Sequence, residues 1–445
     1  MEPLEGKTAG TSGPEGVSTK LKRIAELARK APGMALSTLA HHIDIDFLHV
    51  AYALTRKDGA TGVDGQTAKS YEKNLEGNLR SLLERFKSGT YKAPPVRRVY
   101  IPKGDGSKKR PIGVPTFEDK VLQRAVAMIL EAVYEQDFRD CSYGFRPGRS
   151  AHQALDVLWH GMMEMGGGVV LELDIQDFFG SLGHNHLRSF LDQRIRDGVL
   201  RRMIDKWLAA GTLEDGQVHY PQSGSPQGGV ASPILSNIFL NEVLDCWFED
   251  VVRPRLKGQA FLVRYADDAV IVFSHEEDAK RVMEVLPRRF GKYGLTLHPE
   301  KTRLVPFRRP PKDQDRNTQS GTFDLLGFTH YWGKSRKGSW VVKRQTARSR
   351  LTRALRTFRV WMRRNFHRPI DDQHVDIGRK VQGHYAYYGI TGNARALMSF
   401  LHEVTRLWRT WLGRRSDRAR MSWPKFNEFM SRHPLPRVRI VHSAI

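Results

Sequence analysis

The stretch AFLVRYADDAVIVFS (260–274) carries two adjacent carboxylates, Asp267 and Asp268, between two apolar runs rich in β-branched residues. Apolar runs on either side of a short polar turn predict a β-hairpin, here with both carboxylates at its tip. Like charges held side by side repel each other, and sheet packing does not require them. A divalent cation would remove that penalty, but an ordinary exposed Asp-Asp turn would explain these residues equally well.

A second acidic strand end occurs in GGGVVLELDIQDFFGSL (166–182), where Asp174 closes a buried apolar run. A carboxylate at a strand end beside a two-carboxylate hairpin can hold two Mg²⁺ ions roughly 4 Å apart. Mg²⁺ prefers oxygen ligands, and Mn²⁺ can substitute for it. One ion would lower the pKa of a 3′-hydroxyl, and the other would hold a triphosphate. The sequence therefore predicts a nucleotidyl-transfer site formed by Asp174, Asp267 and Asp268.

The chain is strongly basic, with a net charge of +24 and a pI near 10.1. Such a charge favours a polyanionic partner. Residues 334–445 hold 26 Lys and Arg against 6 Asp and Glu, so most of the excess lies in the last quarter. Histone-like basic proteins are the alternative, but they are usually shorter and poorer in apolar residues than this 445-residue chain with 40% hydrophobic content.

The two cysteines, Cys141 and Cys246, form no CxxC pair. Their small number excludes a Cys-rich zinc module, argues against a disulfide framework and fits a reducing compartment. The N-terminus has no apolar signal-peptide core, and no long uncharged apolar run could span a membrane. We therefore expect a cytoplasmic protein without a membrane partner.

Hydrophobic periodicity and turn residues predict the other elements. Helices are expected within 19–53 and at 68–90, 117–134, 232–249, 277–293, 346–366, 373–388 and 394–415. A hairpin is expected over 96–116, with strands at 99–101 and 110–114, and a further hairpin begins at 325.

Seven sequence blocks in order resemble the group II intron reverse transcriptases, also called maturases. The blocks are GATGVDG (59–65), YIPKGDGSKKRPIGVPTFEDKVLQRAV (100–126), SYGFRPGRSAHQAL (142–155), LELDIQDFF (171–179), GSPQGGVASPILSNIFLNEVLD (224–245), VRYADDAVIVF (263–273) and LTLHPEKT (295–302). Ordered blocks at plausible spacing are far more specific than one motif. The resemblance implies an α+β right-hand polymerase, with fingers and a palm built on an antiparallel sheet packed on helices, followed by an all-α thumb or maturase domain.

The resemblance also divides the chain. We expect a disordered leader at 1–18, an N-terminal extension and fingers with part of the palm at 19–165, a palm at 166–333, a helical RNA-binding thumb at 334–420 and a short basic tail at 421–445. Many family members continue into an endonuclease with Cys and His metal pairs. This chain has no such pairs, so we expect no cleavage of target DNA.

The resemblance implies roles for residues around the nucleotide. Asp174, Asp267 and Asp268 would be the catalytic metal ligands, with the backbone of Ile175 near the metal. The residues implied to bind the incoming deoxynucleotide are Lys103, Arg110, Asp177, Phe178, Phe179, Gln227 and Lys301. A hairpin carrying Lys103 and Arg110 makes a mobile cationic lid over phosphates, although a solvated basic turn is the plain alternative.

Three of these positions have competing explanations. Phe179 would be a steric gate that leaves no room for a 2′-hydroxyl, or a core ring, since Phe178 or Phe179 must pack inward. Lys301 would be a basic residue behind the hairpin, or a merely structural one. Family members usually have an acidic residue after the Phe pair, whereas this chain has Gly180, and nearby Asp177 can substitute for it.

Other residues are implied to contact nucleic acid. They are Gly228, Gly229, Tyr265, Arg350, Arg353, Arg356, Arg359, Arg363 and Tyr385. The two glycines let backbone approach the strand closely. The arginines recur every three or four residues, so one helix face can follow a phosphate backbone, unless the helix is simply solvated. Tyr385 can stack on RNA or pack in a core.

The expected function is RNA-directed DNA synthesis on an RNA template, from a DNA or RNA primer and dNTPs, together with maturase binding of a group II intron RNA. Three alternatives share the scaffold: a catalytically silent RNA-binding splicing factor, a free-standing reverse transcriptase with a host task such as phage defence, and an RNA-dependent RNA polymerase. Intact candidate residues argue against the first, genomic context separates the second, and Phe179 disfavours the third.

Overall fold

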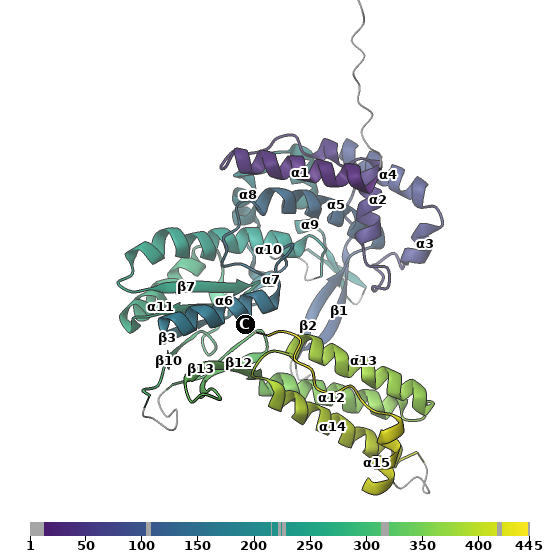
Figure 1. Ribbon diagram of the computed structural model, residues 1–445. Coiled ribbons are helices and arrows are strands. Elements are labelled where there is room, and N and C mark those ends of the chain that lie inside the picture. The colour runs from purple at the N-terminus through teal and green to yellow at the C-terminus, as the bar shows by residue number, and fades with distance from the viewer. Residues whose placement is uncertain are drawn as a thin grey trace, which may run out of the picture.

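The structure is a computed structural model that describes residues 13–103, 108–214, 216–220, 224, 228–312, 320–415 and 421–443; the side chains of Pro14, Lys103 and Lys108 lie outside this description. The chain runs from a group of N-terminal helices, through a central sheet, into a separate helical group near the C-terminus (Figure 1). A long hairpin, β1 and β2, extends from the N-terminal helices toward that last group (Figure 1). The carboxylates of interest lie in the central part.

The central sheet is antiparallel, with strand order β10-β3-β8-β7. Its strands are β3 (Gly167–Leu173), β7 (Ala260–Tyr265), β8 (Asp268–Phe273) and β10 (Arg303–Arg308). Both faces are buried, because alternate side chains point to opposite sides of a sheet. Val170 packs with helix α6, whereas Val169 and Leu171 join the cluster that includes helices α10 and α11. This double burial explains why β3 is apolar along most of its length.

The other strands form three smaller sheets. Their orders are β2-β1-β5-β6, β11-β12-β13 and β4-β9. Their bounds are β1 (Val96–Lys103), β2 (Lys108–Val114), β4 (Ile175–Gln176), β5 (Thr212–Glu214), β6 (Gln217–His219), β9 (Thr296–Leu297), β11 (Phe323–Leu325), β12 (Phe328–Lys334) and β13 (Trp340–Thr346). Pro111 is tolerated in β2 because β2 is an edge strand and needs fewer backbone donors.

Helices cover these sheets and form the two end groups. The helices are α1 (Pro14–Lys30), α2 (Ile45–Leu54), α3 (Ala68–Glu72), α4 (Leu75–Ser88), α5 (Phe117–Tyr134), α6 (Ala151–Met165), α7 (Phe178–Ser181), α8 (His184–Asp192), α9 (Gly198–Leu208), α10 (Ser232–Leu240), α11 (Glu276–Gly291), α12 (Arg348–Asn365), α13 (Ile370–Tyr388), α14 (Ala394–Leu412) and α15 (Trp423–Arg432).

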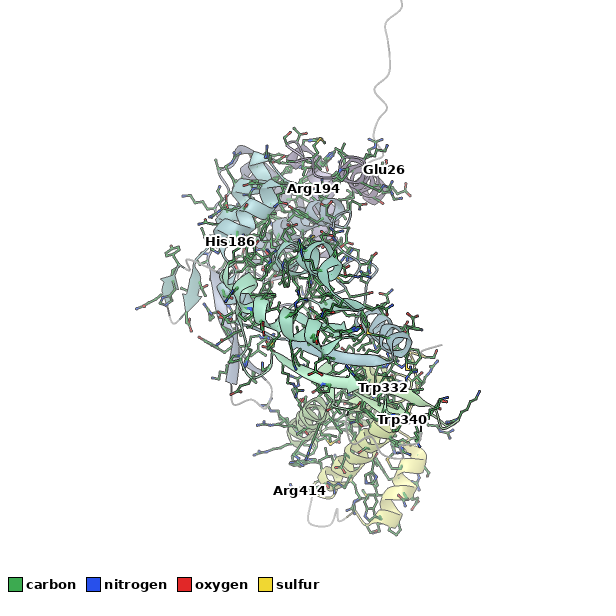
Figure 2. All side chains as sticks on the ribbon, turned by 90° about the vertical axis from the view of Figure 1, so that its left-hand side faces the viewer. Glu26, His186, Arg194, Trp332, Trp340 and Arg414 are labelled. Atoms are coloured by element: carbon green, nitrogen blue, oxygen red, sulfur yellow. The ribbon has the colours of Figure 1, made fainter. Side chains whose placement is uncertain are left out.

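Buried Arg194 joins the N-terminal helices to the rest of the fold (Figure 2). Its guanidinium donates to the carbonyls of Ala28, Ala31 and Met34, each at 2.8 Å, and to Asp137 Oδ2 at 2.7 Å. Two of these carbonyls belong to the last turn of α1 and the residue after it, where helical partners are missing. Arg194 therefore caps the carbonyls at the C-terminal end of α1 and, through Asp137, anchors that end to the rest of the fold.

The last helices pack around their own core. Helix α12 packs on α14, and the cluster also draws side chains from α13 and α15. Trp332 and Trp340, on β12 and β13, lie close together on the side of the central sheet nearest this group (Figure 2). The Asn393 side chain accepts from the Thr346 amide at 2.9 Å, so the start of α14 is tied to the end of β13.

The final described residues return to the junction between the two groups. The amides of Val441 and His442 donate to the Gly389 carbonyl at 2.7 and 2.8 Å, and Thr391 N donates to His442 O at 3.0 Å. The His442 ring stacks on His152 of α6, with centroids 3.5 Å apart. This segment therefore contacts the helical group and helix α6 together.

Two expectations about the chain ends were wrong. The predicted leader 1–18 is too long, because α1 already begins at Pro14, where a proline in the first turn and Glu15 favour a helix start. The predicted tail 421–445 contains α15, whose Phe426 is fully buried in the core of the helical group. Composition marks both segments as polar, but buried Val17 and Phe426 hold the described part of each in a helix.

Two predicted helices also differ in detail. The helix expected at 68–90 is divided into α3 and α4, with Asn74 between them. The helix expected at 232–249 begins as α10 and continues with wider π-type turns as far as Val252. Helices were not predicted for α6, α8 and α9, and the β5–β6 pair was missed.

Candidate active site

The hairpin of β7 and β8 carries the two adjacent carboxylates. Tyr265 pairs with Asp268, which leaves Ala266 and Asp267 as a two-residue turn. Ala266 has φ 56°, a left-handed conformation that costs an L-residue roughly 1–2 kcal/mol. A Cβ on Gly144 would lie 2.4 Å from Ala266 N, so only glycine allows that loop to approach the turn. The tip is therefore tightly shaped.

Asp174 follows β3 beside that tip. The register pairs Leu173 with Ala269, so the next residue, Asp174, lies across from Asp268. The Asp174 carbonyl accepts from His298 N at 2.8 Å, which fixes the local backbone. Ile175 pairs with Leu297 in the β4–β9 ladder and buries its side chain. The sheet register thus brings together the two acidic strand ends that the sequence separates.

The carboxylates influence one another electrostatically. Loss of hydration, together with the negative charges of Asp267 and Asp174, raises the pKa of Asp268 to about 6. Arg350 and Lys301 act in the opposite direction. The Asp268 side chain is open to solvent on one side, so the effect reflects the crowded carboxylates and protein on its other sides.

Lys301 pairs with one of these carboxylates. Its Nζ lies 3.0 Å from Asp174 Oδ2, on a half-exposed side chain. Among the residues that the structure describes, no three carboxylate, His or Cys side chains stand close enough to cage a metal ion as they are placed. The donor set nevertheless suits Mg²⁺, because all its atoms are oxygens and the raised pKa of Asp268 records negative charge that a cation would neutralise. With an ion bound, the Asp174 carboxylate would contact both the ion and Lys301, or would release Lys301 in favour of the ion.

Arg264 holds the hairpin from below and was missed in the sequence. The side chain is fully buried and bonds both oxygens of Asp245, at 2.7 and 2.5 Å. It also donates to Asn237 Oδ1 and Ala266 O, each at 3.0 Å, and to Ser142 Oγ at 2.7 Å. These five bonds use the full donor capacity of a guanidinium. Because one bond reaches the turn carbonyl, Arg264 determines where the carboxylate tip lies.

The β1–β2 hairpin carries the two basic residues predicted to bind the triphosphate, Lys103 and Arg110. Arg110 is exposed on β2 and pairs with Ile101 of β1. The backbone of Lys103 ends β1, but its side chain and the whole of Gln227 lie outside the described residues.

The two glycines next to Gln227 have packing roles. A Cβ on Gly228, which has φ 113°, would lie 2.6 Å from the carbonyl of Gly113 in β2. Gly229 is buried and lines a cavity of about 20 Å³, room for one water. The loop containing them therefore packs directly on the fingers strand, whether or not it also approaches nucleic acid.

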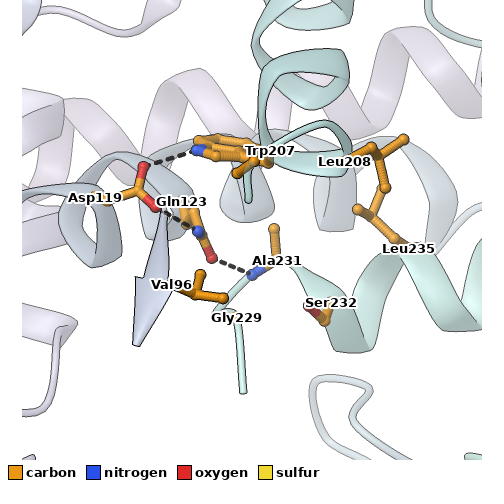
Figure 3. A pocket seen from close by; sticks show the side chains of 10 residues that line it. Val96, Asp119, Gln123, Trp207, Leu208, Gly229, Ala231, Ser232 and Leu235 are labelled. Atoms are coloured by element: carbon orange, nitrogen blue, oxygen red, sulfur yellow. Dashed lines mark hydrogen bonds between the residues drawn. The ribbon is translucent and has the colours of Figure 1, made fainter. Parts of the chain in front are cut away.

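A buried polar chain supports the same loop (Figure 3). Gln123 Oε1 accepts from Val230 N at 2.7 Å, and its Nε2 donates to Asp119 Oδ2 at 2.8 Å. Asp119 Oδ1 accepts from Trp207 Nε1 at 2.7 Å and Tyr91 Oη at 3.0 Å. Burial raises the pKa of Asp119 to about 6, although these donors oppose the shift. This chain of bonds links α5 to the loop, and although Asp119, Gln123 and Val230 lie within the quoted sequence blocks, no role was predicted for them from the sequence.

The two phenylalanines after Asp174 differ in burial: one packs in the core and the other is partly open. Phe178 is 2% exposed and packs edge-on against Phe239, so its ring cannot bind a nucleotide and that prediction was wrong. Phe179 is only partly buried, and its ring lies 5.3 Å from that of Phe178. Asp177 is exposed, with φ 42°. A Cβ on Gly180 would lie 2.2 Å from Asp177 Oδ2, so the Asp177 carboxylate occupies the space beside Gly180.

The thumb arginines lie on the outer face of α12. Arg353, Arg356, Arg359 and Arg363 are exposed, and Arg350 is partly buried near the acidic tip. The opposite face of α12 buries Phe358 and Met362 in the helical core, shared with α14.

Tyr385 belongs to the helical core instead. It is 3% exposed, and its hydroxyl lies 3.4 Å from Pro436 O. The prediction that it contacts nucleic acid was wrong, because apolar periodicity in α13 turns it inward. Tyr265, by contrast, is partly exposed at the hairpin tip.

Taken together, carboxylates at adjoining ends of antiparallel strands, a basic hairpin and a basic helical group define the palm, fingers and thumb of a right-hand polymerase. The sequence pattern of the family described as "Reverse transcriptase (RNA-dependent DNA polymerase)" matches residues 101–330. This region is more than half of the chain, and the chain belongs to that family.

Curated relatives agree with this assignment. The "Group II intron-encoded protein LtrA" of Lactococcus lactis subsp. cremoris is 42% identical over 202 residues, which cover 44% of this chain and 33% of the relative. "Protein YkfC" of Escherichia coli is 35% identical over 328 residues, covering 65% and 84%. "Nuclear intron maturase 2, mitochondrial" of Arabidopsis thaliana is 27% identical over 182 residues, covering 31% and 24%. The resemblance inferred from the seven blocks is confirmed, although the match spans only a third of the Lactococcus protein.

No helix in the described parts of the chain is both long and apolar enough to cross a membrane.

Proposed function

We propose that the chain is an RNA-directed DNA polymerase that adds dNTPs to a primer 3′ end on an RNA template with two Mg²⁺ ions. The observation that carries the proposal is the β3–β8 register, which sets Asp174 across from Asp268 at the end of a buried sheet. Membership of the reverse transcriptase family supports the reaction class. The division into fingers, palm and thumb at residues 165 and 333 is part of the same proposal, as is a cytoplasmic location.

In this mechanism the chain's own residues bind and orient the reactants. Asp174, Asp267, Asp268 and the Ile175 backbone would hold the ions, which would acidify the 3′-hydroxyl and neutralise the leaving pyrophosphate. On the fingers, Lys103 and Arg110 grip the triphosphate, and Gln227 contacts the nucleotide near the template. Phe179 and Asp177 lie beneath the sugar. Lys301 balances the charge of Asp174.

We further propose that the chain binds a group II intron RNA and assists its splicing and mobility. The similarity to proteins named for introns and intron maturases supports this, as does the exposed arginine face of α12. A free-standing reverse transcriptase would have the same palm. Intron RNA domains folding from the DNA that flanks the gene would favour the maturase, and their absence would favour the free-standing enzyme.

The test of the polymerase is primer extension on an RNA template with dNTPs and Mg²⁺. We expect DNA products whose length follows the template. If the purified chain binds primer and template but makes no DNA with either Mg²⁺ or Mn²⁺, it is an RNA-binding factor instead.

Replacement of the partly buried Phe179 by Ala should admit ribonucleotides. Removing the ring opens space for a 2′-hydroxyl, so discrimination against rNTPs should fall roughly 10- to 100-fold in the ratio of kcat/KM values. Single-nucleotide incorporation with matched dNTP and rNTP measures this ratio. Unchanged discrimination, with dNTP incorporation retained, would remove Phe179 from the gate.

Replacement of Arg353, Arg359 and Arg363 by Gln should weaken RNA binding. Each phosphate contact contributes a slope of roughly 0.7–0.9 in log affinity against log salt, so three losses should flatten the slope by about two. Affinity for a structured RNA is measured from 50 to 300 mM salt. A matched triple variant, Lys280→Gln, Arg281→Gln and Arg288→Gln on α11, should keep the wild-type slope, because these residues are exposed on a helix that packs on the central sheet and not in the helical group of α12.

Divalent cations should stabilise the protein more at neutral pH than at acid pH. A carboxyl whose folded-state pKa lies above its ordinary value of 3.8 favours the folded state at low pH, and this advantage is lost as pH rises from 3.8 through about 6. Above that range an ion can replace the missing proton. The increase in Tm on adding Mg²⁺ or Mn²⁺ should therefore be larger at pH 7.5 than at pH 5, and small in Asp268→Asn. An equal increase in that variant would place the bound ion elsewhere.

A further inference from the structure

Phe145, in the block SYGFRPGRS, has an unusual environment for a large apolar side chain. Its φ is 56°, and 55% of its surface is exposed. A left-handed backbone is rare for a bulky residue, and exposing a phenyl ring to water adds to the cost. Such strain persists where surrounding structure enforces it, and it commonly marks a functional position.

The loop around Phe145 is held firmly. Tyr143 N donates to Arg264 O at 2.9 Å, and the Gly144 carbonyl accepts from Asn237 Nδ2 at 2.8 Å. On the other side, Arg146 is 6% exposed and donates to the carbonyls of Arg139 and Ser142, each at 2.8 Å. Its guanidinium also pairs with Glu135 at 3.0 Å. The exposure of Phe145 is therefore built into the loop and is not a result of local looseness.

This loop places the ring beside the carboxylate tip. The rings of Phe145 and Tyr265 have centroids 6.2 Å apart and planes tilted by 44°. Tyr265 pairs directly with Asp268, and Gly144 lies against the backbone of Ala266. Two partly open aromatic faces thus adjoin the place where a primer 3′ end must meet Asp267 and Asp268.

We propose that Phe145 is a stacking platform for the last nucleotides of the primer strand. The inference rests on the proposed polymerase function and adds a binding residue to the same site. Aromatic rings bind bases and sugars through their faces without reading sequence, as a polymerase must. The geometry favours the primer strand over the template. Phe145 contacts Tyr265, Tyr265 pairs with Asp268, and the carboxylate tip is where the primer 3′ end must lie.

Three variants test the platform in the full chain. Phe145→Ala should weaken binding of an RNA template annealed to a DNA primer by roughly 5- to 100-fold, the range for one stacked base. Phe145→Tyr should restore binding. Phe145→Gly should lose affinity like Ala yet unfold at a Tm at or above that of wild type, since glycine accepts the left-handed backbone. Leu54→Ala, which removes another exposed side chain, should leave affinity unchanged.

A fluorescent base locates the contact. With 2-aminopurine at the primer terminus, binding should change its fluorescence in wild type and Phe145→Tyr but not in Phe145→Ala. Wild-type affinity in Phe145→Ala, a lower Tm in Phe145→Gly, or a response confined to a probe in the template would each overturn the proposal. Binding and fluorescence are measured without dNTP, so they test Phe145 even if the chain makes no DNA. Absence of DNA synthesis would count only against the proposed polymerase function.

Discussion

A chain carrying Asp267→Asn and Asp268→Asn will make no measurable DNA. Asparagine keeps the shape of the turn but removes both charges from its tip, so the divalent ions of the proposed mechanism would lose their ligands. Metal ions contribute several kcal/mol to such transition states, which corresponds to a rate loss of roughly a thousandfold or more. Primer extension at saturating dNTP and Mg²⁺ measures the loss.

The control for this variant is a pair of adjacent aspartates in the helical group, far along the chain from the hairpin tip. Asp371 and Asp372 are exposed in the first turn of α13, away from the sheet, and their replacement by Asn should leave synthesis within a few-fold of wild type. Both variants should bind primer–template at least as tightly as wild type, because they lose negative charge. Synthesis that survives in the Asp267, Asp268 variant would disprove the assignment of the tip as the catalytic centre.

The second large effect should come from Asp245→Asn. The carboxylate neutralises Arg264 in a fully buried ion pair, and removing one partner leaves the other charge without compensation. Breaking a buried pair costs roughly 3–5 kcal/mol in the free energy of unfolding. The midpoint of denaturant unfolding of the unit that contains the palm measures this cost.

A solvent-exposed pair gives the matched comparison. Glu277→Gln breaks the Lys257–Glu277 pair, whose side chains are 65% and 76% exposed, and should cost no more than about 1 kcal/mol. A double variant with Arg264→Met and Asp245→Leu should recover much of the stability lost in Asp245→Asn, since neither buried charge remains. It should still synthesise poorly, because the Ala266 carbonyl has lost its donor. Equal costs for the buried and exposed pairs would show that Arg264 is not what holds the hairpin.

The hairpin and the two acidic strand ends could be predicted because each is a local pattern. Apolar alternation, a short turn and a run of Val, Leu and Ile are all visible within about fifteen residues. That Asp174 lies beside the hairpin tip was a hypothesis from the two acidic strand ends, supported by the resemblance to a family, whereas the β3–β8 register itself was not predicted. Sequence spacing says nothing of which strands pair.

The Arg264–Asp245 pair could not be predicted, because the partners of Arg264 come from three separate segments: the 142 loop, the 237–245 helix and the hairpin turn itself. An arginine inside an apolar strand is a signal, since a buried guanidinium requires partners, but nothing local identifies Asp245, Asn237 or Ser142 as those partners. The same holds for the Asp119–Gln123 chain beneath the 228–231 loop, which joins α5 to a segment about a hundred residues away.

The two wrong ring assignments have one cause. Phe178 and Tyr385 lie in motifs rich in functional residues, and proximity in sequence was taken as proximity to the ligand. Their burial is decided by the neighbouring Phe239 and by the core of the helical group, respectively. Helical periodicity in α13, which brings Tyr385 to the same face as Ile377 and Val381, would have been the better guide.

The return of residues 441–442 to Gly389 has a consequence for the order in which the protein is built on the ribosome. The palm and the first thumb helices can collapse as they emerge, but the joint between them lacks its closing backbone bonds until His442 has been synthesised. Earlier contacts across the joint, such as Tyr387 Oη to the Leu326 carbonyl at 2.8 Å and the Asn393–Thr346 pair, can form before those last residues emerge. The last residues therefore close a joint that the preceding helices have already begun to hold.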